Sequence, residues 1–197
     1  MIHVIRHYDL LIDEGNDPFH DPPALKQYMD QWDGRKFIEA LNLSPGKNVL
    51  EIGMGTGRIA ARVAPCCLHL TGIDISPKTI RQARENLKAY PNVDFVCDDF
   101  LHHRFTQTFD IVYSSLTMMH FEDKRQVIEK VDRLLNTGGI FCLSIDKNQD
   151  PFIDMGSRKI RIYPDTPEEI VRLVGESSMR VAKVIETDHA HILVCEK

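Results

Sequence analysis

A short apolar run that leads directly into a turn of alternate glycines limits most strongly what this chain can fold into. The segment is Val49-Leu-Glu-Ile-Gly-Met-Gly-Thr-Gly57. Glycine accepts positive φ angles and lets a ligand approach the backbone closely. The helix expected at 57–64 would offer free N–H groups and a positive dipole end to a negative group. At the carboxyl end of a first parallel strand, this arrangement is typical of a nucleotide-like ligand site.

Two other phosphate-binding loops share these glycines but do not match the spacing. The dinucleotide fingerprint needs a third glycine or alanine where Arg58 stands, and a Walker loop needs a Gly-Lys-Ser/Thr sequence. The remaining alternative is a glycine turn that serves only to pack a strand against a helix.

The chain after residue 47 alternates short apolar runs with amphipathic segments. Strands are expected at 49–52, 68–75, 93–97, 109–114 and 140–145, followed by a closing pair at 179–185 and 191–195. Helices are expected at 57–64, from Ser76-Pro77 onward, at 123–135 and at 166–178, with a glycine turn at 136–139. This order predicts an α/β, doubly wound, mainly parallel sheet that ends in an antiparallel hairpin.

The segment before the sheet carries two apolar helical stripes. One contains Tyr28 and Trp32, and the other contains Phe37 and Leu41. We expect residues 1–47 to form a helical cap on a core of residues 48–197, with 1–197 as one domain. The connection 147–164 exceeds the roughly 12–15 residues typical of a plain loop, so it is a candidate lid or substrate loop.

Acidic residues follow the second and third expected strands. Asp74 ends the second strand, where a carboxylate can accept hydrogen bonds from the two hydroxyls of a ribose. The pair Asp98-Asp99 ends the third strand, where one carboxylate can accept from an exocyclic adenine amine. The alternatives are a helix cap for Asp74 and a solvated turn for the pair.

With these motifs in order, the run from 48 to 145 resembles the class I S-adenosylmethionine-dependent methyltransferases, in particular their small-molecule branch of quinone-biosynthesis and metabolite enzymes. The resemblance implies a Rossmann-like, seven-stranded sheet with an antiparallel last strand, and S-adenosylmethionine as cofactor, released as S-adenosylhomocysteine. It implies these cofactor-binding residues: Tyr8, Glu51, Gly53, Gly55, Gly57, Asp74, Ile75, Asp98, Asp99, Phe100, Ser114 and Ser115. The chain departs from the family pattern at Asp98, which replaces a glycine, and within 134–139, which keeps only the two glycines of the usual turn.

The sulfonium of such a cofactor already activates its methyl group, so the protein would act mainly by holding an acceptor in line with it. His120 is the candidate general base for an acceptor that carries a proton, with a packing role as its alternative. His102 and His103 are expected on a surface loop. The place where nucleic-acid amino methyltransferases carry an Asn/Asp-Pro-Pro-aromatic motif holds Ser114-Ser115-Leu116, which argues against a flipped base as substrate.

Net charge and composition limit which other classes of protein and partner fit this sequence. A net charge of −5 and an isoelectric point near 6.0 argue against a nucleic-acid partner. We expect a soluble, cytoplasmic protein, because there is no signal-like N-terminus, no bilayer-length apolar run and no paired cysteine spacing. No metal site is expected.

The acceptor stays open at this point. An acidic cluster near Tyr8 favours an amine acceptor; its members are Asp13, Glu14, Asp17 and Asp21. Arg158, Lys159 and Arg161 in 147–164 favour an anionic acceptor instead, and the alternative for both clusters is a solvated surface. The attacking atom and the oligomeric state are also open. The rival functions are a non-catalytic S-adenosylmethionine-binding module and, disfavoured by the glycine spacing, a nicotinamide-dependent oxidoreductase.

Overall fold

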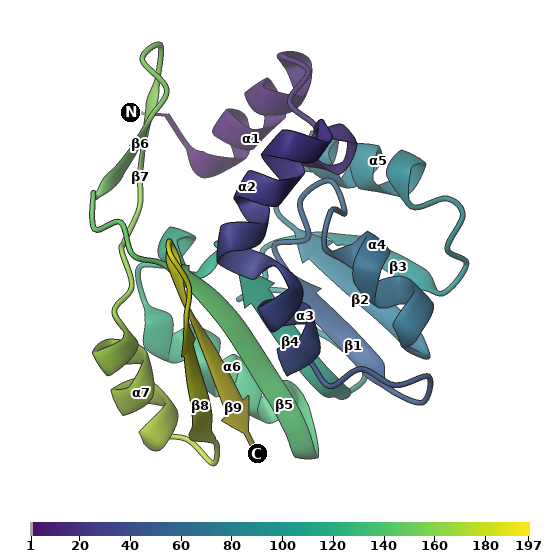
Figure 1. Cartoon of the computed structure of the whole chain (residues 1–197), viewed down its shortest axis with the longest axis vertical. Coiled ribbons are helices and arrows are strands. Elements are labelled where there is room, and N and C mark those ends of the chain that lie inside the picture. Colours follow the sequence, from purple (N-terminus) through teal and green to yellow (C-terminus); the bar gives the residue numbers. More distant parts are fainter. Residues whose placement is uncertain (1) are drawn as a thin grey trace.

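A seven-stranded sheet forms the centre of the computed structural model, which describes residues 2–197 (Figure 1). The order across the sheet is β3-β2-β1-β4-β5-β9-β8. Six strands run in the same direction, and only β9, between β5 and β8, runs antiparallel to its neighbours. Their bounds are β1 Asn48–Ile52, β2 His69–Asp74, β3 Val93–Cys97, β4 Phe109–Ser115, β5 Leu135–Asp146, β8 Arg180–Glu186 and β9 Ala190–Glu196. The predicted mainly parallel sheet with an antiparallel last strand is therefore confirmed.

Helices cover both faces of this sheet, as a doubly wound fold requires. They are α1 Val4–Asp13, α2 Pro23–Asp33, α3 Arg35–Ala40, α4 Ala60–Val63, α5 Pro77–Asn86, α6 Lys124–Leu134 and α7 Pro167–Gly175. α6 and α7 bury their apolar sides against one face, and α3, α4 and α5 against the other. The predicted helical cap at the N-terminus consists of α1, α2 and α3.

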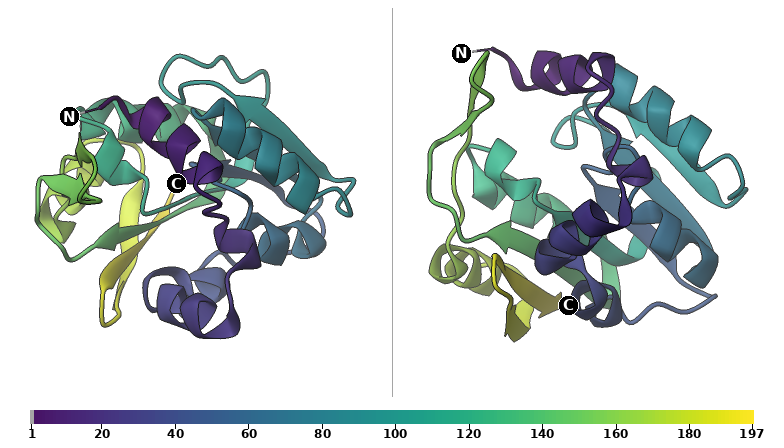
Figure 2. Two further views of the ribbon diagram at one scale, coloured as in Figure 1. Left: turned by 90° about the horizontal axis from the view of Figure 1, so that it is seen from above. Right: turned by 45° about the horizontal axis from the view of Figure 1, so that its top comes forward.

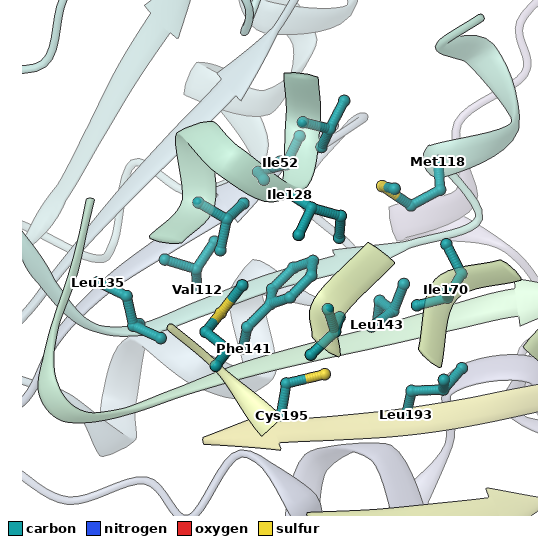
Figure 3. Packing of buried hydrophobic residues seen from close by; sticks show 14 of the residues in the cluster. Ile52, Val112, Met118, Ile128, Leu135, Phe141, Leu143, Ile170, Leu193 and Cys195 are labelled. Carbon is teal, nitrogen blue, oxygen red and sulfur yellow. The ribbon is translucent and has the colours of Figure 1, made fainter. Parts of the chain in front are cut away.

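The core on the α6–α7 side explains why strands and helices stay together. Phe141 and Leu143 from β5 meet Ile128 from α6 and Ile170 from α7 (Figure 3), and all four are buried. Burying one such side chain contributes about 1.5–3 kcal/mol relative to leaving it in water. Cys142, between Phe141 and Leu143, belongs to the core on the opposite face, so successive buried residues of β5 pack against helices on the two sides of the sheet.

Side-chain caps start the helices at the residues that the sequence indicates. The Ser76 hydroxyl accepts from the Thr79 N–H (3.1 Å), and the Thr166 hydroxyl accepts from the Glu169 N–H (3.2 Å). A Pro follows each cap at the first helical position, where its missing N–H costs nothing.

Two local expectations were wrong, and two other segments show detail that the sequence pattern did not indicate. The helix after the glycine loop spans only Ala60–Val63, because the chain first completes further turns. The glycines at 136–139 do not interrupt the chain before β5. They lie inside it, where the register with β4 shifts and Gly138 takes a φ of +77°. The connection 147–164 forms a second small sheet from β6 Phe152–Asp154 and β7 Lys159–Arg161. The apolar stripe of α2 is partly exposed, with Tyr28 at 49%.

The N-terminal helix and this β6–β7 hairpin lie side by side, and α1 also lies beside α5 (Figures 1 and 2). The Arg158 guanidinium, on the hairpin, pairs with the Glu14 carboxylate at 2.5 and 2.7 Å. The Asp9 carboxylate, on α1, accepts from the Ser76 hydroxyl (2.7 Å) and the Lys78 N–H (3.2 Å) at the start of α5. Segments far apart in sequence thus hold α1 over the carboxyl ends of the strands. No helix within residues 2–197 is both long and apolar enough to cross a membrane.

Candidate functional site

A cavity of about 370 Å³ lies at the carboxyl ends of the central strands, within the size range of small-molecule sites. The ends of β1, β2 and β4, the turns that follow β3 and β4, and α1 supply its walls. The lining residues are His3, Val4, Tyr8, Ile52, Gly53, Gly55, Ile73, Asp74, Ile75, Asp98, Asp99, Phe100, Ser115, Leu116, Thr117, His120 and Phe121.

Two glycines give the loop after β1 its shape. Gly53 and Gly55 have φ angles of +74° and +56°, in the region that favours glycine. A Cβ on Gly53 would lie 2.2 Å from the Thr117 hydroxyl oxygen, so this glycine also permits close packing against the turn after β4. The loop therefore exposes bare backbone to the cavity.

Asp74 lies beside this loop with part of its hydrogen-bonding capacity unused. One carboxylate oxygen accepts from the Gly55 N–H and the other from the Ser76 N–H, each at 3.0 Å. Burial raises the pKa of Asp74, and the hydrogen bonds from backbone N–H groups partly oppose this increase. Each carboxylate oxygen can accept a second hydrogen bond, so the pair can receive two hydroxyls of one ligand.

The acidic pair after β3 borders the cavity but is bonded within its own turn. The His103 ring contacts the Asp98 carboxylate at 2.9 Å and holds the pKa of that group below its usual range. The Asp99 carboxylate accepts from the Leu101 N–H at 2.8 Å and contacts the His102 ring at 2.9 Å. Phe100 is almost fully buried, and it lines the cavity while packing into the core.

Tyr8 and His120 close the cavity on the side of α1. The Tyr8 hydroxyl lies 2.7 Å from His120 Nε2. Burial lowers the pKa of His120 to about 4 and raises that of Tyr8, so both groups are neutral at pH 7. Within residues 2–197, His120 Nδ1 is buried and has no hydrogen-bond partner.

Three residues that the family resemblance implied do not line the cavity. Glu51 and Ser114 are buried within β1 and β4, and burial raises the pKa of Glu51 to about 8. Gly57, with a φ of +93°, packs instead against Leu87 at the C-terminal end of α5, since a Cβ there would lie 2.7 Å from Leu87 Cδ1. The other predicted residues, Tyr8, Gly53, Gly55, Asp74, Ile75, Asp98, Asp99, Phe100, Ser115 and His120, come together in one place.

Sequence reasoning did not identify Leu116, Thr117 and Phe121, which line the cavity after β4. Leu116 has a φ of +52°, a strained value for a branched side chain. Their positions next to Ser115 and His120 were the only available signal.

The charged residues considered for the acceptor are engaged elsewhere. No residue of 147–164 lines the cavity. Lys159 pairs with Asp154 at 2.7 Å, and Arg161 lies 5.3 Å from the centre of the Tyr163 ring. On the acidic side, Asp13 pairs with Lys78 at 2.6 Å. Neither cluster therefore offers an unpaired charge at the cavity. Residues 2–197 contain no group of three or more His, Cys, Asp or Glu that could hold a metal ion.

The sequence of residues 49–139 matches the family model described as a methyltransferase domain. The chain is 31% identical over 145 residues to 2-methyl-6-phytyl-1,4-hydroquinone methyltransferase of Synechocystis sp., covering 66% of this chain and 43% of that protein. It is 33% identical over 113 residues to phosphoethanolamine N-methyltransferase 1 of Arabidopsis thaliana, covering 56% and 23%. The chain thus spans less than half the length of these two relatives.

Solved structures share the fold over nearly the whole chain. The complex of DhpI with S-adenosylhomocysteine superimposes with a TM-score of 0.78 at 18% identity, covering 98% of this chain and 94% of that one. NodS of Bradyrhizobium japonicum, also bound to S-adenosylhomocysteine, gives 0.68 at 19% identity and covers 90% and 89%. The [4+2]-cyclase SpnF gives 0.76 at 17% identity and covers 98% and 95%.

Proposed function

We propose that this chain is a class I S-adenosylmethionine-dependent methyltransferase, which transfers a methyl group from this cofactor to a small-molecule acceptor. The match of residues 49–139 to a methyltransferase domain supports the proposal, as does the similarity to a hydroquinone methyltransferase. The observation that carries the proposal is Asp74, which keeps two acceptor positions free beside the glycine loop. A buried carboxylate with spare acceptor capacity fits the two hydroxyls of a ribose. Bare backbone at Gly53 and Gly55 fits a ligand held closely against the loop.

Different residues of the cavity would bind different parts of the cofactor. Asp74 would hold the ribose, Asp98, Asp99 and Phe100 would surround the adenine, and the glycine loop with Ser115 would hold the methionine part. When bound, the cofactor supplies a methyl group already activated by a positive sulfur. The protein then needs to keep the acceptor in line with that group and to exclude water. Such positioning of the reactants lowers the barrier by roughly 7–11 kcal/mol in favourable cases. Tyr8 and α1 would exclude water by covering the cavity.

His120 is the proposed base for acceptors that carry a proton. Its lowered pKa, about 4, leaves the imidazole neutral at pH 7, as a base must be, but makes it a weak one. Its contact with Tyr8 suits a second role, that of holding α1 over the cavity.

A small acceptor suits a cavity roofed by α1, because an extended polymer would meet that helix and the hairpin beside it. The net charge of −5 gives no attraction for nucleic acid. We assign residues 1–197 to one methyltransferase domain in the cytoplasm. All five cysteines are free thiols, which fits a reducing compartment.

The test of this proposal is cofactor binding followed by methyl transfer. S-adenosylhomocysteine at about 100 times its Kd is expected to stabilise the protein by about 2.7 kcal/mol, visible as a raised Tm, while NAD leaves the Tm unchanged. Incubation with methyl-labelled cofactor and a metabolite extract, followed by mass spectrometry, is expected to show one labelled small molecule. Stabilisation by NAD alone would refute the proposal. Binding without label transfer to any acceptor would favour a non-catalytic S-adenosylmethionine-binding module.

Protonation of His120 should weaken the fold at low pH. The folded pKa of about 4 lies below the usual 6.5, so the folded state takes up fewer protons than the unfolded chain between these values. The stability that neutral His120 contributes is complete above pH 6.5 and is lost as pH falls toward 4, amounting to about 3 kcal/mol at most. This loss of stability can be measured by urea unfolding of the wild type and of His120→Asn at pH 7 and at pH 4.5.

The variant should lose less stability than wild type between those two pH values. Tyr8→Phe provides a second comparison, because it removes only the hydroxyl contact. We expect it to cost about 1 kcal/mol at pH 7 and to keep the wild-type pH dependence. An identical pH dependence in His120→Asn and wild type would contradict this account.

A further inference from the structure

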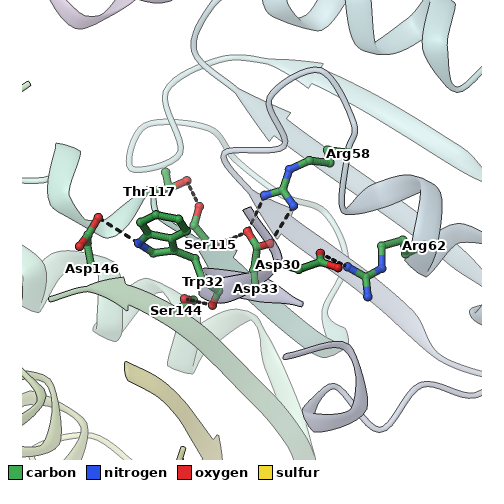
Figure 4. Close-up of polar contacts among 9 residues, drawn as sticks. All are labelled: Asp30, Trp32, Asp33, Arg58, Arg62, Ser115, Thr117, Ser144 and Asp146. Atoms are coloured by element: carbon green, nitrogen blue, oxygen red, sulfur yellow. Dashed lines mark hydrogen bonds and ion pairs between the residues drawn. The ribbon is translucent and has the colours of Figure 1, made fainter. Parts of the chain in front are cut away.

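A buried ion pair joins the N-terminal cap to the glycine loop. Asp33, the last residue of α2, is fully buried, and Arg58 directly follows Gly57. The Arg58 guanidinium donates to both carboxylate oxygens, from Nη1 to Oδ1 at 2.7 Å and from Nη2 to Oδ2 at 2.5 Å (Figure 4). Two parallel charge-assisted bonds fix the orientation of both side chains as well as their separation.

The same carboxylate also holds the end of β4. The Ser115 hydroxyl donates to Asp33 Oδ2 at 2.6 Å, and Ser115 lines the cavity. Two residues later, the Thr117 hydroxyl donates to the Ser115 carbonyl at 3.0 Å, while its side chain packs against Gly53. One carboxylate thus fixes two walls of the cavity, the glycine loop and the turn after β4, relative to each other.

The neighbouring Trp32 keeps Asp33 at this position. The Ser144 hydroxyl donates to the Trp32 carbonyl at 2.6 Å, and Trp32 Nε1 donates to Asp146 Oδ2 at 3.1 Å (Figure 4). Both partners lie on β5, so the end of α2 is attached to a strand of the sheet. The carboxylate is therefore a fixed point from which Arg58 and Ser115 are held.

Burial makes this pair hard to replace. The side chain of Arg58 is 16% exposed and that of Asp33 is 0%, so little water can reach the pair to replace a lost partner. Without the carboxylate, the guanidinium would have to move toward solvent to recover hydration. Because Arg58 adjoins Gly57, such a movement displaces the glycine loop.

We propose that Asp33 and Arg58 are positioning residues for methyl transfer, which set the geometry of the cofactor loop and of Ser115 without touching the cofactor. The proposal rests on the function proposed above. It requires α2 to be docked on the sheet before the cavity has its binding shape, so that the cap is part of the cofactor site.

A second ion pair between α2 and the segment that follows the glycine loop provides a matched control. Asp30 lies one turn earlier than Asp33 on α2, and Arg62 lies in α4, shortly after Arg58. Arg62 Nη1 contacts Asp30 Oδ1 at 3.1 Å. The side chain of Arg62 is 35% exposed and that of Asp30 is 47% exposed, so water can replace either partner.

The experiment compares Asp33→Asn with Asp30→Asn by calorimetric titration with S-adenosylhomocysteine, at a temperature where circular dichroism shows both variants folded. We expect Asp33→Asn to raise the Kd about tenfold or more, because small displacements of binding groups are costly. Asp30→Asn should stay within about twofold of wild type, as for other exposed pairs. Arg58→Lys, which keeps the charge but loses the double contact, should give a smaller loss than Arg58→Gln. Asp33→Asn/Arg58→Gln should lose little more affinity than Arg58→Gln alone.

A purely structural ion pair would give a different result. It would lower the Tm of Asp33→Asn and leave the Kd of the folded protein at the wild-type value, which would overturn the proposal. Should Asp33→Asn fail to fold, an unchanged Kd in Arg58→Lys would overturn it equally. Failure of the wild type to bind S-adenosylhomocysteine would instead refute the underlying function.

Discussion

Replacing Asp74 with alanine is expected to weaken binding of S-adenosylhomocysteine by on the order of 100- to 10,000-fold, because two hydrogen bonds to a charged group are lost, worth about 3–6 kcal/mol together. The variant also leaves the Gly55 and Ser76 N–H groups without their carboxylate acceptor, so the glycine loop loses part of its support. Calorimetric titration gives the change in Kd, and the Tm of the variant without ligand reports the structural part separately.

Two further variants define the role of the Asp74 carboxylate. Asp74→Asn keeps one oxygen acceptor but not the charge, so we expect an intermediate loss. Asp94→Ala removes a carboxylate from the adjacent strand β3, where the side chain is 71% exposed and contacts His69. It should leave the Kd within about twofold, as expected for a screened surface charge. Wild-type affinity in Asp74→Ala would remove this residue from the ribose site.

The largest loss of stability is expected from Lys124→Met. The Lys124 ammonium donates to the carbonyls of Met118 (2.5 Å) and Tyr163 (2.7 Å) and pairs with Asp165 at 2.9 Å, with both side chains below 5% exposed. The change leaves Asp165 charged or protonated without a partner in the interior. We expect a loss of about 3–5 kcal/mol, seen as a Tm lower by about 6–20 °C.

Its control is Arg133→Ala, which breaks an exposed pair with Glu129 at 4.0 Å on the same helix, α6. That change should cost less than about 0.5 kcal/mol. The double variant Lys124→Met/Asp165→Leu should recover part of the loss, since no unpaired charge then remains buried. Equal Tm values for Lys124→Met and Arg133→Ala would show that the buried pair contributes nothing.

The Lys124 interaction also explains how the hairpin connection stays near the site. Tyr163, at the end of 147–164, donates its N–H to the Met119 carbonyl at 2.7 Å, next to His120. The ammonium of Lys124 therefore holds the turn after β4 and the end of the connection together. A loss of this pair is expected to loosen the wall that carries His120.

Local features of the sequence were sufficient to predict the strands of the large sheet and the residues at which several helices begin. Ser76 and Thr166 cap their helices because a hydroxyl followed by proline favours that conformation within four residues. The short strands β6 and β7 have no such signal, because three residues are too few to show a period. The stripe of α2 correctly indicated a helix, but its partial exposure was not predictable, because an apolar period does not show how far a helix is buried.

The sequence by itself determined the order of strands and helices, the glycine loop and Asp74, since each depends on neighbouring residues whose backbone preferences are local. Only the tertiary structure decided that Glu51, Gly57 and Ser114 lie outside the cavity wall, because strand pairing and helix packing set the direction of each side chain. It also decided the pairing of Asp33 with Arg58, 25 residues apart in sequence. A contact of that kind depends on where α2 docks on the sheet, and no local preference encodes it.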